Sequence, residues 1–149
     1  MKILKLTLAI LFCNSLSMAD NFNEKHKINK SYIKTMAKTE SNYLEINGKE
    51  ELKKAIKEKK LNSNYEKDGK KHIYIDIKNV HLTKRDLKEL DEVNIGSNIK
   101  GDGKVVQNVN IKRVRLDTNK PINIGVRITG DRKGSITAIT NIENSQLGR

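Results

Sequence analysis

Residues 122–131 read INIGVRITGD, and residues 93–102 of the same chain read VNIGSNIKGD. In both copies apolar side chains alternate with polar ones or glycine, with Ser97 as the one polar residue on the apolar face. This is the period of a β-strand with one buried face. Each copy ends in Gly-Asp, a pair that favours tight turns. Each turn then leads into a second β-prone run. The sequence therefore predicts a strand, a turn and a strand, written twice at about 93–116 and 122–147.

We interpret this unit as a duplicated β-hairpin. The alternating stretch HIYIDI at 72–77 predicts one more strand. Asn47 and Glu50 resemble a capping box for a helix at 47–61, and Thr83 is a candidate N-cap for a shorter helix. The fold class predicted from these elements is α+β, with short N-terminal helices packed on an antiparallel sheet built from the duplicated hairpin.

A second architecture fits the same residues. Ile136, Ile139 and Ile142 recur at every third position, and asparagine is frequent around them. Short Asn-rich repeats of this kind suit a small β-solenoid or a polymerising β-repeat protein. Two repeats are fewer than a solenoid needs for stability. Stacking between chains could supply the rest, so self-association belongs to this alternative.

The first residues predict a secretory signal peptide at 1–19. Lys2 and Lys5 precede a short apolar run, and small residues end at Ala19. Its removal would also remove Cys13, the only cysteine of the chain. We expect an exported protein that resides in the periplasm or outside the cell, including the cell surface. After cleavage we expect no transmembrane segment. Residues 20–46 are predicted to be a loosely ordered basic segment, and 47–149 a single domain.

The chain is strongly basic. Its formal net charge is +12, and +10 remains once Lys2 and Lys5 are removed with residues 1–19. Such a surface favours polyanions such as nucleic acid, lipopolysaccharide or acidic glycans. Abundant Lys, Asn and Ile also follow from AT-rich codon usage. Arginine is harder to explain in this way, and it is concentrated late in the chain. The predicted binding residues are Arg113, Arg115, Arg127, Arg132 and Lys133.

Patterns that carry catalysis are sparse. His72 and His81 are candidates for the acid and base of a small secreted nuclease or toxin. No metal-ligand spacing, phosphate-binding loop, nucleophile elbow or dinucleotide fingerprint occurs in the sequence. We therefore expect no metal and no cofactor.

These observations favour a non-enzymatic binding or structural protein. It would present the basic repeat surface to a protein, to a cell-surface structure or to its own copies. A polyanion-binding module is the alternative, and a nuclease or toxin is the third hypothesis.

Overall fold

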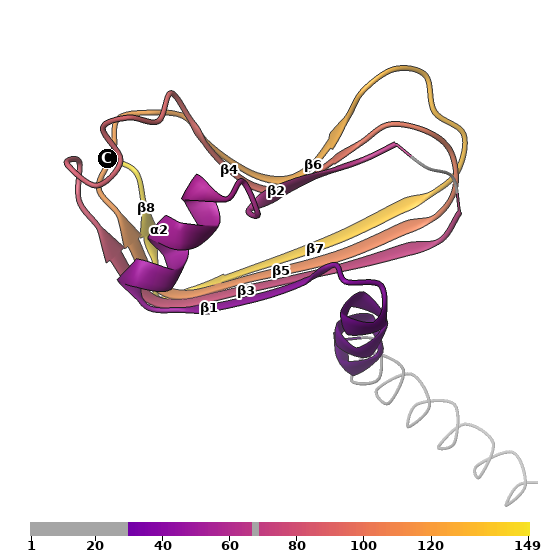
Figure 1. The fold of residues 1–149 in the computed structure, drawn as a ribbon, viewed down its shortest axis with the longest axis horizontal. Coiled ribbons are helices and arrows are strands. Elements are labelled where there is room, and N and C mark those ends of the chain that lie inside the picture. Colours follow the sequence, from indigo (N-terminus) through magenta and orange to yellow (C-terminus); the bar gives the residue numbers. More distant parts are fainter. Residues whose placement is uncertain (1–29, 67–68) are drawn as a thin grey trace, which may run out of the picture. The chain divides into compact units, whose positions relative to one another are not determined.

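The strands of this protein run parallel to their neighbours and form two facing sheets (Figure 1). The computed structural model describes residues 30–66 and 69–149, and Ile33–Arg149 form one unit. The long sheet has the order β1-β3-β5-β7, and β8 also pairs with β5. The short sheet has the order β2-β4-β6. The long sheet consists of β1 (Tyr43–Asn47), β3 (Lys71–Leu82), β5 (Val105–Leu116), β7 (Ile136–Glu143) and β8 (Gln146–Leu147), and the short sheet of β2 (Asn62–Tyr65), β4 (Val93–Ile99) and β6 (Ile122–Ile128).

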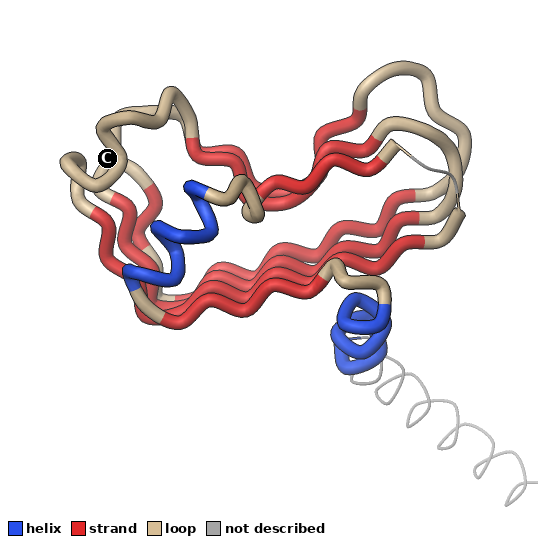
Figure 2. Tube along the Cα trace, in the orientation of Figure 1, coloured by secondary structure: helices blue, strands red, loops and turns tan. Residues whose placement is uncertain are grey.

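The chain alternates between the two sheets, so that it winds as a β-solenoid of about three turns. The first coil holds β1, helix α2 (Lys49–Lys57) and β2, the second holds β3 and β4, and the third holds β5 and β6. Strands β7 and β8 start the next coil. Figure 2 shows the strands of successive coils stacked along both sheets and the loops gathered at the two sides.

The predicted antiparallel sheet of β-hairpins is wrong. The two copies of the repeat lie side by side as β4 and β6, in parallel register from Val93 opposite Ile122 to Ile99 opposite Ile128. Strands β4 and β5, predicted to form one hairpin, belong to different sheets. The Gly-Asp pairs lie in the corners between the sheets. Side chains alternate with a period of two in either topology, so the pattern could not decide between them. The alternative, a β-solenoid, is the architecture of the structure.

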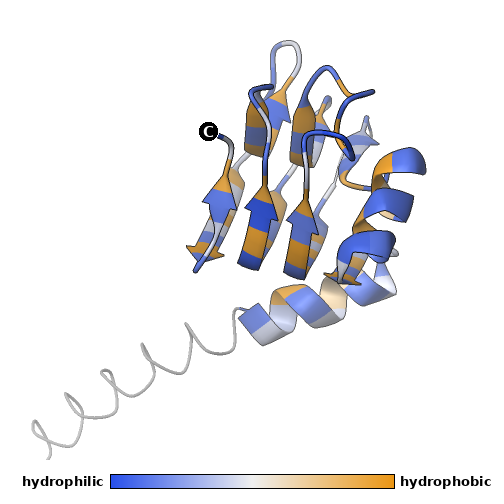
Figure 3. Ribbon diagram, turned by 90° about the vertical axis from the view of Figure 1, so that its left-hand side faces the viewer, coloured by the Kyte–Doolittle hydropathy of each residue, from blue (hydrophilic) through white to orange (hydrophobic). Residues whose placement is uncertain are grey.

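The core lies between the two sheets and is built from stacked apolar rows. One row is Ile77, Ile111 and Ile142, and another is Tyr65, Ile99 and Ile128. Helix α2 contributes the buried Leu52 and Ala55 to this core from the first coil. In Figure 3, α2 lies at the side of the solenoid opposite the C-terminus.

The predicted helices differ in outcome. The helix expected at 47–61 is confirmed in a shorter form as α2. The segment after Thr83 forms turns and no α-helix. Its predicted cap is present, because the Thr83 hydroxyl and the Asp86 carboxylate bond each other and each other's backbone N–H.

Two glycines permit the short sheet to bend. Gly96 and Gly125 are register partners with φ of +143° and +132°, which L side chains rarely adopt. A Cβ on Gly96 would lie 1.8 Å from the carbonyl oxygen of Gly125, whereas a Cβ on Gly125 would meet nothing within 4 Å. The glycine of the repeat therefore serves the close stacking of the coils.

Residues 33–39 are helical and pack on the outer face of the long sheet. Ile33 and Ala37 are fully buried against Tyr74 and Val106. A parallel ring stack of Tyr43 on Tyr74, with centroids 5.5 Å apart, continues this cluster across β1 and β3. This second cluster covers part of the outer face of the long sheet and is separate from the core between the two sheets.

The predicted signal peptide at 1–19 lies outside the described residues. No helix in the described ranges is long and apolar enough to cross a membrane. Within the segment 20–46, the structure describes residues 30–46, which include the helical residues and most of β1. The domain boundaries at 19 and 46 stay predictions.

Candidate functional site

Long strands of the solenoid bend sharply at one stacked position. Gly48, Asn79, Arg113 and Asn144 follow one another in successive coils, and all four have positive φ, from +48° to +108°. Asparagine and glycine tolerate this conformation, whereas an arginine there costs about 1 kcal/mol. At this bend each coil turns out of the plane of the long sheet, and the residues beyond the bend form a lateral face (Figure 2).

Beyond the bend, the outward side chains form a polar column. His81, Arg115 and Gln146 are register partners on this lateral face. Asp117 accepts hydrogen bonds from two of its neighbours: its carboxylate lies 2.9 Å from His81 Nε2 and 2.8 Å from Arg115 Nε. These two contacts hold the pKa of Asp117 at about 2. The carboxylate fixes both side chains while leaving them partly exposed, His81 by 54% and Arg115 by 43%.

Arg113 lies at the bend itself, beside that column. Its side chain is exposed, and it forms no ion pair with any residue that the structure describes. Its register neighbours are asparagines, not acids. A guanidinium in this position can donate several hydrogen bonds to an incoming anion.

Together these residues line a shallow groove along the corner of the solenoid. Its exposed lining is polar or cationic, because the side chains of Val80 and Val114 are buried in the core. The lining residues are Asn79, Val80, His81, Arg113, Val114, Arg115, Asn144, Ser145 and Gln146. The groove therefore combines two arginines, one imidazole and three amides. Chemically, it suits a phosphate, sulfate or carboxylate group and offers no nucleophile paired with a base.

His72 has a structural place. The imidazole is buried, and Glu40 binds it twice: the carboxylate accepts the backbone N–H of His72 at 2.7 Å and lies 2.7 Å from Nδ1. The straight part of β3 from His72 to Lys78 spans about 20 Å, which separates His72 from His81 beyond the bend. The structure therefore does not bring the two predicted catalytic histidines together.

The predicted cationic residues are divided among three places. Arg113 and Arg115 share the groove. Arg132 and Lys133 lie in the turn between β6 and β7, on the other side of the solenoid. The guanidinium of Arg132 donates to the carbonyl oxygens of Gly101 and Gly103 in the preceding coil, so this side chain holds two turns together.

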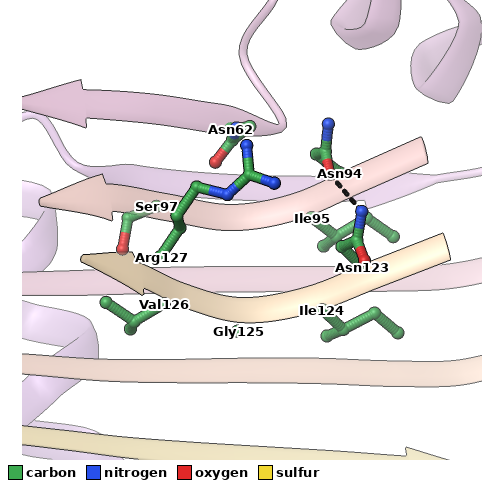
Figure 4. A pocket seen from close by; sticks show the side chains of 9 residues that line it. All are labelled: Asn62, Asn94, Ile95, Ser97, Asn123, Ile124, Gly125, Val126 and Arg127. Atoms are coloured by element: carbon green, nitrogen blue, oxygen red, sulfur yellow. Dashed lines mark hydrogen bonds between the residues drawn. The ribbon is translucent and has the colours of Figure 1, made fainter. Parts of the chain in front are cut away.

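Arg127 lies on the outer face of the short sheet, above the bend made by the glycines (Figure 4). Its side chain reaches from β6 over β4, near Asn62. Asn123 donates a hydrogen bond of 2.9 Å to Asn94 on the same face. This hollow is a second polar depression with a single cation.

Several features of the groove were not predicted from the sequence. Asn79 and Asn144 carry a usable signal, because asparagine favours positive φ. They lie two coils apart, with Arg113 at the stacked position between them. Asp117 carried none, since it joins His81 and Arg115 only after the coils stack. No group of three or more possible metal ligands occurs among the residues that the structure describes.

Comparison with known proteins adds no relative: family models, curated proteins and solved structures gave no match to this chain. The fold and the groove by themselves define the class of protein: a short parallel β-solenoid with a cationic corner.

Proposed function

We propose that this chain is an exported, non-enzymatic binding protein that holds a polyanion along the corner of its solenoid. Export is supported by the signal-peptide pattern of residues 1–19, and the net charge of +10 that remains without these residues supports attraction of anionic polymers. The observation that carries the proposal is the convergence of His81, Arg113 and Arg115 in one groove.

The groove suits a polymer better than a small ligand. It is shallow and runs across successive coils: His81 comes from β3, Arg113 and Arg115 from β5, and Gln146 from β8. Asp117 orients the His81 and Arg115 side chains, which lowers the entropy lost on binding. A chain of sulfate or phosphate groups could contact several of these donors in succession, and the asparagine amides could bond its hydroxyl groups.

Heparin is a suitable first probe, with Arg113→Asn as the variant. Asparagine removes the charge but accepts the φ of +54° at this position, so the fold should be retained. Loss of one charge-assisted hydrogen bond, about 1.5 kcal/mol, predicts roughly tenfold weaker binding. Wild-type affinity should also fall steeply with salt.

Arg127→Asn is the matched control, because it removes the same charge from the exposed outer face of the short sheet. If both variants lose affinity equally, binding follows net charge alone and the groove is not the site. If heparin does not bind wild-type protein at low salt, the polyanion proposal is wrong.

The nuclease hypothesis receives no comparable support from the positions of His72 and His81. Its test remains a nucleic-acid zymogram, in which activity dependent on either histidine would contradict a non-enzymatic role.

A further inference from the structure

The C-terminal end of the solenoid leaves core residues exposed. Strand β7 is the last strand of the long sheet, and β6 is the last strand of the short sheet. The core rows end there on Ile142, which is 49% exposed, and Ile128, which is 55% exposed. Helix α2 lies at the other side of the stack (Figure 3), and no helix in the described residues covers β6 or β7.

Strand β7 also lacks the usual protection of an edge. Solvent-exposed edge strands are commonly interrupted by proline, charged by lysine or shortened. The sequence of β7 is ITAITNIE, in which Glu143 at the last position is the only charge. The row of backbone donors and acceptors on its free side is therefore an open template for another strand.

We propose that a second copy of this chain docks on this end, with β7 pairing antiparallel to β7 of its partner. A two-fold axis perpendicular to the solenoid axis brings the two C-terminal ends together and reverses the strand direction. The same surface serves on both copies, and its few charges keep the repulsion between two basic chains small at this point.

The alternation of side chains restricts the register. Core-facing residues of one strand must face core-facing residues of the other, so a register centred on Ile139 is allowed. It brings Ile136 of one copy opposite Ile142 of the other and thereby covers the exposed isoleucine of β7. Glu143, which forms an ion pair of 3.0 Å with Lys112 of its own chain, then lies diagonally across from Lys133 of the other copy, within reach of a long side chain. This pair occurs twice by symmetry, which provides charge complementarity at both ends of the strand pair.

The first test is the mass of the full chain by analytical ultracentrifugation across a range of protein concentrations. Wild-type protein should reach the mass of a dimer, and Ile142→Lys should remain a monomer with an unchanged circular-dichroism spectrum. Thr39→Lys adds the same charge at an exposed position on another face and should still dimerise. A wild-type monomer at every concentration, or a dimer that persists in Ile142→Lys, would overturn the proposal.

The second test examines the register by oxidative cross-linking. In a chain that carries Cys13→Ser, Ile139→Cys should form a covalent dimer, because the two side chains face each other across the axis. Thr39→Cys, on the helix that covers the long sheet, should not. Failure of Ile139→Cys to cross-link, or equal cross-linking of both variants, would contradict the pairing.

Discussion

The paired glycines Gly96 and Gly125 allow the steric fit between coils to be measured separately from backbone strain. Both positions have a φ that disfavours alanine, so each Gly→Ala substitution costs about 1–3 kcal/mol in backbone strain. Only Gly96→Ala also places its Cβ 1.8 Å from a backbone oxygen, that of Gly125. Forced overpacking of this kind adds about 1–3 kcal/mol. We therefore expect Gly96→Ala to be less stable than Gly125→Ala by about 2 kcal/mol.

Urea and thermal unfolding, followed by circular dichroism at low protein concentration, measure this difference. With about 4 °C of Tm per kcal/mol for a domain of this size, Gly96→Ala should melt about 8 °C below Gly125→Ala. The low concentration limits any contribution from association through β6 and β7. Equal destabilisation by both variants would refute the reasoning, because it would mean that neighbouring coils are not in contact at the glycine of the repeat.

Three further predictions concern the corner and the core. Arg113→Gly should raise the free energy of unfolding by about 1 kcal/mol in urea titrations, because an exposed arginine at φ +54° is strained; a loss of stability would contradict this. The pKa of Asp117 is lower in the folded protein, about 2, than in the unfolded chain, so its carboxylate stabilises the fold above the unfolded pKa. The stability advantage of wild type over Asp117→Asn should therefore be complete above about pH 4 and disappear as the pH falls through about 2. An advantage independent of pH would exclude this contribution. Ser97→Ala should cost about 1–3 kcal/mol, because it removes the hydroxyl that donates to the buried Gln107 at 2.6 Å, and adding Gln107→Met should recover most of that loss; no recovery would show that the bond is not the cause.

Local features of this fold are predictable from the sequence, and the topology is not. The alternation in HIYIDI and in both repeats correctly indicates strands, and the amphipathic spacing of Leu52, Ala55 and Ile56 indicates α2. Parallel and antiparallel strands share the same alternation, however, and a Gly-Asp turn can close a hairpin or form the corner of a coil. The exact spacing of 29 residues between the copies was the signal for stacked coils, since equal positions of a solenoid lie one coil apart.

The candidate site, too, could be predicted from the sequence only in part. The late arginines could be singled out by composition, and two of them, Arg113 and Arg115, lie in one groove. Their approach to His81 depends on a register of 34 residues between β3 and β5, which no local pattern specifies. Arg132 could not be separated from them by sequence, because its role as a donor to Gly101 and Gly103 exists only between coils.

The parallel register of the repeat is the central claim, and backbone NOEs in isotope-labelled protein test it most directly. The structure predicts contacts between β4 and β6 at a constant offset of 29 residues, with Asn94 beside Asn123 and Gly96 beside Gly125. A hairpin would instead give contacts between residues 93–99 and the segment that follows Gly101-Asp102, with an offset that changes by two at each step. Observation of the second pattern in place of the first would contradict the solenoid.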